Sequence, residues 1–365
     1  MAAPIVVTGG KKRGDVASEP KWKRIPEMKK LLFALIMIGL LSSGQAFPCT
    51  GIFLNKDPVK LVGRTMDWPT GDGYVSINES SIHKQADPPQ DKSSRIEWVS
   101  KYGSVTFNMK VKLNWFVKIL AWMSGVKDGH PSCGLNEKGL WGGGFWIHPP
   151  PAVKYPQKDG RASINDYQLL EYLLDTSANV EEAINNLGAV RVSGFKTGDF
   201  EVDLHWFLAD ASGDSVIIEF PDGKLRIHRR PSPSVITNSF YEHSREYLSD
   251  FNGFGGNKPI PIENGEMTTE NRFLFASYML GKYTGERKDS FDPIFDIMKT
   301  VTQTDTRHME TSQAVTQWTA VYDLVNRKLS WTSRGKPAVR SIALEKIDFT
   351  NTGKKNRQIR FDEVF

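Results

Sequence analysis

A cysteine directly behind an apparent export signal is the feature that most constrains this 365-residue chain. Lys29 and Lys30 are followed by the eleven-residue apolar run 31–41 and by the small residues of Gly44-Gln45-Ala46. This order of basic, apolar and small residues is typical of a secretory signal. The apolar run is too short to span a bilayer, which takes about 20 residues. We therefore expect export to the periplasm or the medium, with no stable membrane anchor.

The position of Cys49 gives it two reactive groups. Cleavage after Ala46 leaves Phe47-Pro48 ahead of the cysteine, and we expect these two residues to leave by self-cleavage. The first residue of a mature chain carries a free α-amine beside its side chain, so a nucleophile and a base lie within one residue. This arrangement is typical of an N-terminal nucleophile hydrolase. Lipidation of Cys49 is the alternative, but it requires a small residue where proline stands.

The pI of about 8.9 belongs to the leader and not to the rest of the chain. Residues 1–48 contain eight Lys or Arg and three Asp or Glu, which leaves 39 of each sign in residues 49–365. This neutral remainder lacks the basic footprint of a nucleic-acid-binding protein. We expect residues 1–48 to be a leader, signal peptide and short propeptide that are removed, and residues 49–365 to form a single catalytic domain.

Five short blocks follow in order along the chain and together are far more specific than any one of them. In this order they resemble the choloylglycine hydrolase family, which comprises bile salt hydrolases and penicillin V acylases. The blocks are Cys49-Thr50-Gly51 with Gly63-Arg64-Thr65-Met66-Asp67-Trp68, then 134–146, 204–219, Ile236-Thr237-Asn238-Ser239 and Asn271-Arg272-Phe273. The resemblance implies a four-layer αββα sandwich of α+β class and hydrolysis of a linear amide.

Hydrophobic patterning agrees with such a sandwich. Strand-like alternation or apolar continuity occurs in six runs: 49–54, 73–78, 104–109, 140–147, 203–209 and 215–220. Helical patterns are found over 164–174, over a segment that opens at Asn179 with Glu182 as a capping box and closes at Gly188, and over 293–301. We expect the run 142–144, three glycines, to let its strand pass close to catalytic residues and not to hold a phosphate.

The first two blocks supply the chemistry of the nucleophile. An α-amine has a pKa near 7.7–8.0 and a thiol a pKa of about 8.5, so the amine of Cys49 can accept the thiol proton. We expect Arg64 beside Cys49 on the second strand of a hairpin, where a guanidinium favours the thiolate. A carboxylate at Asp67 would orient the amine. Spacing alone leaves open a surface ion pair between Arg64 and Asp67.

The later blocks supply the remaining site residues that the resemblance implies. Amide hydrolysis needs donors aimed at the oxyanion of the tetrahedral intermediate. The side chain of Asn238, at a strand end, and the backbone N–H of Trp146 match the two donor positions of the family. Arg272, at the start of a helix-like stretch, matches an arginine that supports the nucleophile's pocket. A plain turn residue is the alternative for Asn238.

Aromatic residues indicate the substrate. Trp68 and Trp146 match the penicillin V acylases of Gram-negative bacteria, and two indoles suit a phenoxyacetyl group or a fatty acyl chain. The segment 111–125 is expected to be a lid over this pocket or a membrane-facing patch, and a core helix is the alternative. We expect a small N-acyl amide as substrate, such as penicillin V or an N-acyl homoserine lactone. Conjugated bile salts and an inactive exported binding protein are the alternatives.

Other expectations concern cofactors, disulfides and assembly. The seven histidines are too far apart for a short metal motif, and we expect neither a metal nor another cofactor. The two cysteines allow a Cys49–Cys133 disulfide as an alternative role for Cys49. The connection from Asn238 to Arg272 is shorter than in the Gram-positive relatives. A homo-oligomer is therefore open, and a tetramer is in doubt.

Overall fold

The computed structural model describes residues 49–68, 73–109, 129–147, 153–197, 200–201, 203–261, 267–284, 292–303, 315–350 and 357–360. The expected leader over residues 1–48 and the expected lid over 111–125 lie outside the described residues.

Among the described residues, one antiparallel sheet has six strands and includes the strand that Cys49 opens. Its order is β16 (Val235–Ile236), β1 (Cys49–Lys56), β2 (Val59–Trp68), β17 (Val315–Asp323), β18 (Lys328–Ser333) and β19 (Lys336–Ala343). β1 and β2 form a hairpin that turns at residues 57–58. This hairpin lies inside the sheet, because β16 pairs with β1 and β17 pairs with β2.

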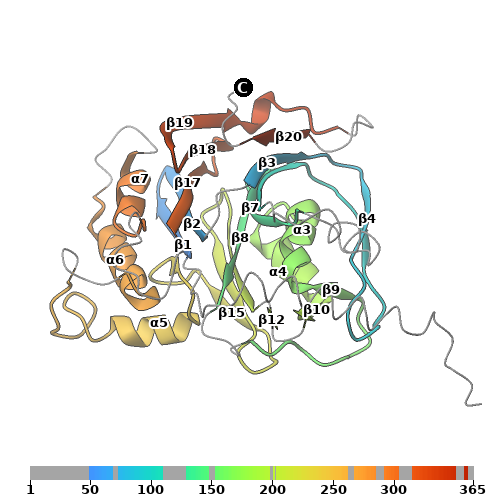
Figure 1. The fold of residues 1–365 in the computed structure, drawn as a ribbon, viewed down its shortest axis with the longest axis horizontal. Helices are drawn as coiled ribbons and strands as arrows, with labels where there is room; N and C mark the ends of the chain where they lie inside the picture. Colours follow the sequence, from blue (N-terminus) through green and yellow to red (C-terminus); the bar gives the residue numbers. More distant parts are fainter. Residues whose placement is uncertain are drawn as a thin grey trace, which may run out of the picture.

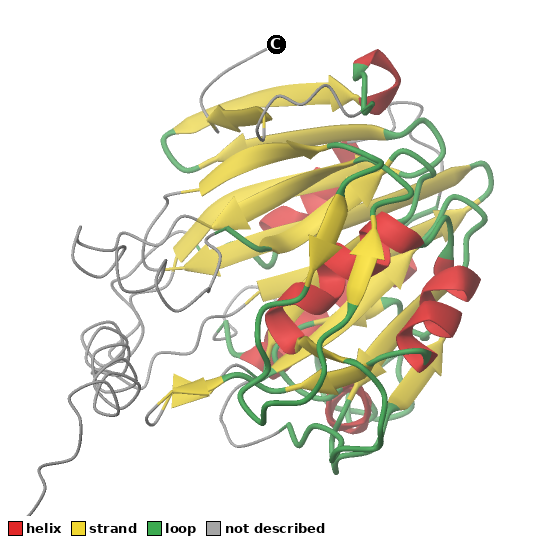
Figure 2. Cartoon of the chain, turned by 90° about the vertical axis from the view of Figure 1, so that its right-hand side faces the viewer, coloured by secondary structure: helices red, strands yellow, loops and turns green. Residues whose placement is uncertain are grey.

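The second sheet has eight strands in the part of the chain that the structure describes. Its order is β15 (Arg226–Arg229), β14 (Ser215–Glu219), β13 (Leu204–Ala209), β8 (Trp141–Trp146), β7 (Pro131–Asn136), β6 (Ser104–Met109), β3 (Gly73–Asn78) and β20 (Arg357–Arg360). The two sheets are stacked (Figure 2). Between them, the ring of Phe107 stacks on Trp318 at 5.9 Å and Trp141 lies 5.8 Å from Tyr322, so aromatic side chains fill the space between the sheets.

Helices cover the outer face of each sheet (Figure 1). On the side of the six-stranded sheet lie α5 (Tyr241–Leu248), α6 (Thr269–Lys282) and α7 (Asp292–Lys299), with α6 against β1 and α7 against β2. On the side of the eight-stranded sheet lie α3 (Asp166–Thr176) and α4 (Val180–Gly188), with α3 against β7 and β8. The shorter elements are β4 (His83–Gln85) with β5 (Glu97–Val99), β9 (Ser163–Asn165) with β10 (Arg191–Ser193), β11 (Lys196–Thr197) with β12 (Phe200–Glu201), and the 3-10 helix η2 (Leu344–Lys346).

The predicted four-layer αββα arrangement is confirmed, with small differences at element ends. The helix expected over 164–174 begins two residues later, at Asp166, because Ile164 and Asn165 pair with β10 instead. The capping box of α4 is shifted: Asn179 accepts from the N–H of Glu182 at 2.9 Å, whereas the Glu182 carboxylate accepts from Ala178 at 2.9 Å. Both contacts still satisfy N–H groups that a helix start leaves unpaired.

Alternation along the hairpin divides its side chains between two faces of the sheet. Cys49 pairs with Met66, and Gly51 pairs with Arg64. A Cβ on Gly51 would lie 2.6 Å from the Phe145 ring of β8, so these residues face the eight-stranded sheet. We call this side the inner face, and it comprises Cys49, Gly51, Arg64, Met66 and Trp68.

The other side of the hairpin faces the helices. A Cβ on Gly63 would lie 2.6 Å from Ile294 of α7. Asp67 and Thr65 have the same parity as Gly63 on β2, and Thr50 pairs with Thr65. We call this side the helix face, and it comprises Thr50, Gly63, Thr65 and Asp67. The polar residues expected around Cys49 are therefore divided between two layers of the molecule.

Candidate active site

Cys49 lies at the first position of β1 and is 5% exposed. Its backbone N–H donates to Oδ1 of Asn238 at 2.6 Å, and its Sγ lies 3.6 Å from Sδ of Met66. Arg64 lies on the second strand of the hairpin near Cys49, as expected. Met66 is the residue directly opposite Cys49, and Arg64 is on the same inner face, two residues nearer the turn at residues 57–58.

Arg64 is buried, with 1% of its surface exposed, and its contacts are backbone carbonyls and a ring. Nη1 donates to the carbonyl of Ser132 at 2.9 Å and Nη2 donates to that of Gly144 at 2.7 Å. The guanidinium carbon lies 4.3 Å from the centre of the Phe145 ring, in cation–π contact. The alternative of a surface ion pair with Asp67 is excluded, since both side chains are buried and they lie on opposite faces of β2.

The glycine run on β8 gives Arg64 its room. A Cβ on Gly143 would lie 2.5 Å from Nη1 of Arg64, and a Cβ on Gly142 would lie 2.5 Å from Leu170. Contacts under 3 Å are far inside van der Waals distance, so a side chain at position 143 would displace the guanidinium. The interpretation that these glycines let the strand pass close to the expected site residues is confirmed by this geometry.

Asp67 lies on the helix face and is fully buried. Its Oδ1 accepts from Oγ1 of Thr316 at 2.5 Å, whereas its Oδ2 is buried without a hydrogen-bond partner. Burial raises the pKa of this carboxyl to about 7, although Arg272, Thr316 and Arg64 oppose the rise. A buried carboxylate oxygen without a hydrogen-bond donor costs free energy, so a donor placed next to Oδ2 would stabilise the ionised carboxylate.

Arg272 joins the helix layer to the nucleophile. It stands in the first turn of α6 and is fully buried. Nη1 donates to the carbonyl of Cys49 at 2.8 Å and to Oγ1 of Thr50 at 2.9 Å, and Nη2 donates to Oδ1 of Asn238 at 3.0 Å. Burial lowers the pKa of Arg272, and Asp67 opposes this effect. The arginine thereby fixes both the backbone and the polar neighbours of Cys49.

Asn238 follows β16 by two residues and connects three of the expected residues. Its Oδ1 accepts from Cys49 and from Arg272, so the orientation of the amide is set by donors on one side. Its Nδ2 donates to the carbonyl of Trp146 at 2.6 Å. The structure therefore joins Cys49, Asn238 and Arg272 in one buried hydrogen-bond network. The charge of Arg272 also acts on Asp67, on the helix face, and Arg64 lies on the inner face with Cys49. Oxyanion stabilisation by Asn238 and Trp146 stays a prediction.

The electrostatic surroundings of the thiol combine opposing influences. Burial raises the pKa of Cys49, and the charge of Asp67 raises it further. The guanidiniums of Arg64 and Arg272 and the backbone N–H of Asp67 lower it. Removing either arginine would therefore leave burial less opposed and the thiol harder to ionise.

A cavity of about 190 Å³ opens onto Cys49. Its lining consists of Cys49, Arg64, Met66, Trp68, His130, Pro131, Ser132, Gly144, Trp146, Tyr167, Leu170, Leu204 and Trp206. The rings of Trp68 and Trp146 stack on each other with centroids 5.9 Å apart and planes 26° apart, and both residues line the cavity. Both indoles are partly exposed at this cavity, so the alternative that they are ordinary core aromatics is not supported.

His130 and Tyr167, which sequence reasoning missed, also line this cavity. The imidazole lies 3.5 Å from Asp87 and 3.6 Å from Glu171, and its ring centroid lies 4.8 Å from that of Tyr167. Burial acts to lower the pKa of His130, but the two carboxylates outweigh it and raise the pKa to about 9. No pattern in the sequence marks His130, which precedes β7. The position of Met66 opposite Cys49 depends on the register of the hairpin, which spacing alone does not fix.

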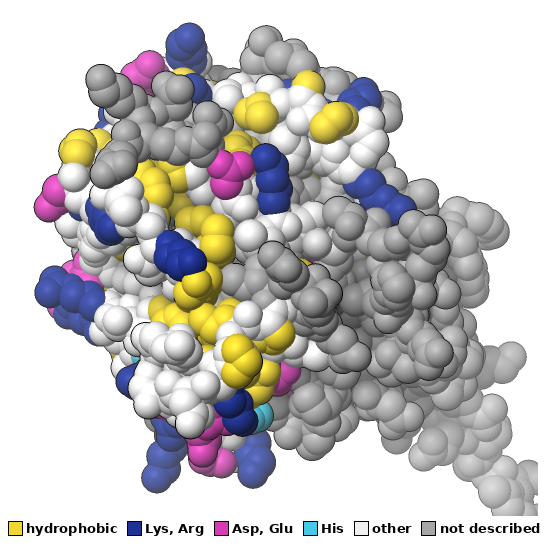
Figure 3. Space-filling model, turned by 90° about the vertical axis from the view of Figure 1, so that its left-hand side faces the viewer, with side chains coloured by type: hydrophobic (Ala, Val, Ile, Leu, Met, Phe, Trp, Pro, Cys, Tyr) yellow, Lys and Arg dark blue, Asp and Glu magenta, His cyan; other side chains and the backbone are white. Residues whose placement is uncertain are grey.

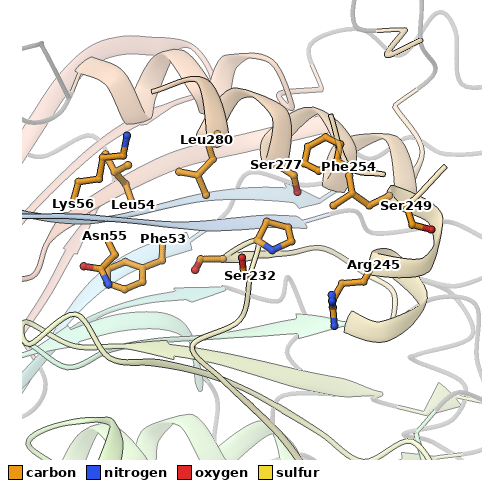
Figure 4. A pocket seen from close by; sticks show the side chains of 14 residues that line it. Phe53, Leu54, Asn55, Lys56, Ser232, Arg245, Ser249, Phe254, Ser277 and Leu280 are labelled. Carbon is orange, nitrogen blue, oxygen red and sulfur yellow. The ribbon is translucent and has the colours of Figure 1, made fainter. Parts of the chain in front are cut away.

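A second, larger cavity of about 510 Å³ lies at the other end of β1 (Figure 4). It is lined by Phe53 and Leu54 of β1, by residues of α5 and α6 such as Arg245 and Leu280, and by residues 232–234. On the face that α5–α7 present, hydrophobic side chains form a band beside basic ones (Figure 3). Cys49 does not line this cavity, so it is not part of the candidate active site.

Other features of the described residues bear on the remaining expectations. Cys49 and Cys133 are both free, which excludes the alternative of a disulfide between them. Sγ of Cys133 lies 3.2 Å from the hydroxyl of Tyr322. Within the described ranges, no group of three or more His, Cys, Asp or Glu side chains is placed to hold a metal ion. No helix in the same ranges is long and apolar enough to cross a membrane.

Comparison with known proteins places this geometry in context. The family model for linear amide C–N hydrolases of the choloylglycine hydrolase family matches residues 49–356. The penicillin V acylase of Pectobacterium atrosepticum is 28% identical over 273 residues, covering 70% of this chain and 66% of that protein. The bile salt hydrolase/transferase of Clostridium perfringens is 26% identical over 304 residues, covering 74% and 85%.

Solved structures share the fold. The penicillin V acylase of Agrobacterium tumefaciens superposes with a TM-score of 0.66 at 23% identity, covering 87% of this chain and 94% of that one. A mutant of the conjugated bile acid hydrolase of Clostridium perfringens gives a TM-score of 0.67 at 21% identity, covering 87% and 98%. The fold is therefore that of the N-terminal nucleophile hydrolases, as predicted.

Proposed function

Because the chain belongs to the choloylglycine hydrolase family of linear amide C–N hydrolases, we propose that it hydrolyses N-acyl amides with Cys49 as an N-terminal nucleophile. The observation that carries this proposal is the convergence on Cys49 of Asn238, Arg272 and Arg64, beside a buried carboxylate oxygen of Asp67 that has no donor. Cleavage before Cys49 would turn its peptide N–H into an amine with further hydrogens, and one of them would satisfy Asp67.

The reaction would proceed in two steps through an acyl thioester. The amine of Cys49 takes the thiol proton, and Sγ attacks the carbonyl carbon of the substrate amide. The side chain of Asn238 and the backbone N–H of Trp146 would donate to the oxyanion. The amine of the substrate leaves with the proton, and a water molecule, deprotonated by the same α-amine, then hydrolyses the thioester to a carboxylic acid and the free thiol.

The cavity favours a flat or extended acyl group. Its wall of two stacked indoles complements an aromatic ring or an acyl chain, and its volume of about 190 Å³ is small for a thick steroid. The substrate class in this proposal is therefore penicillin V and N-acyl homoserine lactones, ahead of glycine- or taurine-conjugated bile salts. The relative from Clostridium perfringens is a bile salt hydrolase/transferase, which makes bile salts the competing substrate in the test.

The same proposal includes the export and processing of the chain and its assembly. Residues 1–48 direct export and are removed, and residues 49–365 form one catalytic domain that acts in the periplasm or outside the cell without a cofactor. The partner is a small N-acyl amide. A homo-oligomer is compatible with the proposal, which does not require a tetramer.

The test begins with intact mass and N-terminal sequencing of the exported protein, followed by assays of amine release from penicillin V, acyl homoserine lactones, glycocholate and taurocholate. We expect an N-terminal Cys49 in the active protein. Cys49→Ala should abolish hydrolysis and retain Phe47-Pro48, whereas the control Cys133→Ala should keep its activity. Preference for glycocholate would make the protein a bile salt hydrolase. Retained Phe47-Pro48 with no hydrolysis of any substrate would make it a binding protein.

A further inference from the structure

We propose that His205 and Glu219 are a buried positioning pair for the nucleophile, a role that rests on the proposed function. Neither residue lines the cavity at Cys49. His205 is 0% exposed and Glu219 is 1% exposed. Both side chains are ionisable, and burying an ionisable group costs free energy unless it is paired.

Three hydrogen bonds and one peptide link connect Glu219 and His205 to Cys49. Nδ1 of His205 lies 2.8 Å from Oε1 of Glu219, and its Nε2 lies 2.9 Å from the carbonyl oxygen of Thr237. Thr237 is followed directly by Asn238, whose side chain accepts from the N–H of Cys49 at 2.6 Å. The imidazole therefore ties β13 of the eight-stranded sheet to the segment that holds the amine of the nucleophile.

The partners of His205 fix the orientation of its ring. A carbonyl oxygen can only accept a hydrogen bond, so Nε2 of His205 must donate to Thr237. Burial acts to raise the pKa of Glu219, but hydrogen bonds from His205 and His228 outweigh it and lower the pKa to about 2. The ring is therefore held between the side chain of Glu219 and the backbone of Thr237.

Other groups packed against the pair also contact the carboxylate of Glu219. Oε1 of Glu219 also accepts from the backbone N–H of Tyr241 at 2.9 Å, and Oε2 lies 3.1 Å from Nε2 of His228. His228 has a second partner in Glu242, at 3.4 Å from Nδ1. The polar partners of His228 among the described residues are Glu219 and Glu242 and do not include Thr237, so it offers a matched control for the role of His205.

The sequence places the pair where such a link can form. His205 is next to Trp206 on β13, and Glu219 is next to Ile218 on β14, and Trp206 pairs with Ile218. His205 and Glu219 therefore lie opposite each other on β13 and β14, one position past the pair of Trp206 and Ile218. A cross-strand pair at a strand end is rigid, and it can position a following loop better than a side chain from that loop.

The experiment compares His205→Gln, Glu219→Gln and the control His228→Gln in the purified mature protein. The concentration of competent enzyme is found by stoichiometric alkylation of Cys49, and kcat is expressed per alkylatable thiol. We expect kcat to fall roughly 10- to 100-fold in the first two variants with KM nearly unchanged, because small misplacements of a base can cost about this much. The control should lose less than about threefold. Unchanged kcat per thiol in His205→Gln would overturn the proposal, since a structural role lowers only the number of competent molecules.

A second measurement applies even if these variants fail to fold or the chain has another substrate. Nitrogen-15 NMR of the wild-type imidazoles should show one histidine, absent from any soluble His205→Gln protein, whose Nε2 carries a proton held in a hydrogen bond at pH 7.5. An unprotonated Nε2 in that histidine would overturn the inference. The NMR result does not depend on hydrolysis, so failure of the pair and failure of the proposed function can be distinguished.

Discussion

The inner face of the β1–β2 hairpin places Cys49 and Arg64 against the eight-stranded sheet, whereas the helix face places Asp67 against α6. On the inner face, the guanidinium is compensated by the carbonyls of Ser132 and Gly144 and by an aromatic ring. On the helix face, a carboxyl group with one unpartnered oxygen lies near a buried arginine. Under the proposed function, the thiol of Cys49 is served mainly by the inner face, and its amine would be served by the helix face.

Because the two faces contact different groups of Cys49, substitutions on each face should have different effects. A change on the inner face should alter the ionisation and the substrate contacts of the thiol. A change on the helix face should alter the base and the stability of the buried charges. Four predictions test whether these two sets of effects can be separated.

The largest expected effect is loss of turnover in Asp67→Asn on the helix face. To keep maturation out of the comparison, the chain can be expressed with its initiator methionine directly before Cys49. We expect kcat/KM to fall roughly 10³-fold, because the amine loses the carboxylate that holds it as a base. Penicillin V hydrolysis is the measurement. A variant with more than a tenth of wild-type activity would show that Asp67 does not serve the amine.

The second prediction concerns pH and the stability of an unprocessed protein, Cys49→Ala. Burial raises the pKa of Asp67 to about 7, above the usual value of 3.8, so the folded state holds a proton that the unfolded state releases between these values. The contribution of Asp67 to stability is therefore complete below about pH 4 and is lost as the pH rises to about 7. Asp67→Asn in this background should be more stable by about 2–4 kcal/mol at pH 8, with little difference at pH 4.

Urea unfolding at the two pH values measures this difference. The mature protein is the control, because an N-terminal ammonium near Asp67 would offset the cost of its charge. Equal pH dependence in the mature and unprocessed proteins would mean that the amine and the carboxylate do not interact.

The third prediction moves to the inner face. Arg64→Met should lower kcat/KM roughly 100-fold and raise the apparent pKa of the thiol, because the guanidinium is the largest influence opposing burial at Cys49. The rate of alkylation by iodoacetamide against pH reports the ionisation directly. Arg64→Lys is the matched control and should recover part of the rate. If the dependence of the alkylation rate on pH is unchanged in Arg64→Met, Arg64 does not stabilise the thiolate of Cys49.

The smallest expected effect is selective loss of binding in Trp68→Ala, also on the inner face. Each buried methylene contributes about 0.8 kcal/mol, so removing half of the indole wall should raise KM for long acyl chains about tenfold and for short chains less than about threefold. A series of acyl homoserine lactones of increasing length measures this. The alkylation rate of Cys49 should stay near that of the wild type. Equal changes in KM across the series would show that the acyl group lies elsewhere.

Much of this arrangement could be predicted because it depends on local pattern. The short strands over 73–78 and 104–109 match the observed β3 and β6, since alternation and flanking turns mark them in the sequence. The five ordered blocks identified the family, and they contain the residues that the structure brings around Cys49. The alternation within β2 also implies that Arg64 and Asp67 face opposite ways.

What could not be predicted depends on register and on distant contacts. The turn at residues 57–58 sets Met66 and not Arg64 opposite Cys49, and the spacing of two residues on different strands does not fix that register. His130 reaches the cavity through carboxylates far along the chain, Asp87 and Glu171, which no local pattern connects. The orientation of the Asn238 amide depends on donors from β1 and α6 together.

The close approach of Gly143 to Arg64 has a consequence for the history of such chains. Because a Cβ at position 143 would lie 2.5 Å from Nη1 of Arg64, the two positions cannot drift independently. A descendant that acquires alanine at 143 must move the guanidinium from its place between the carbonyls of Ser132 and Gly144. Position 143 therefore reports on Arg64: among descendants of this chain, a side chain there would mark a guanidinium that has left its present position.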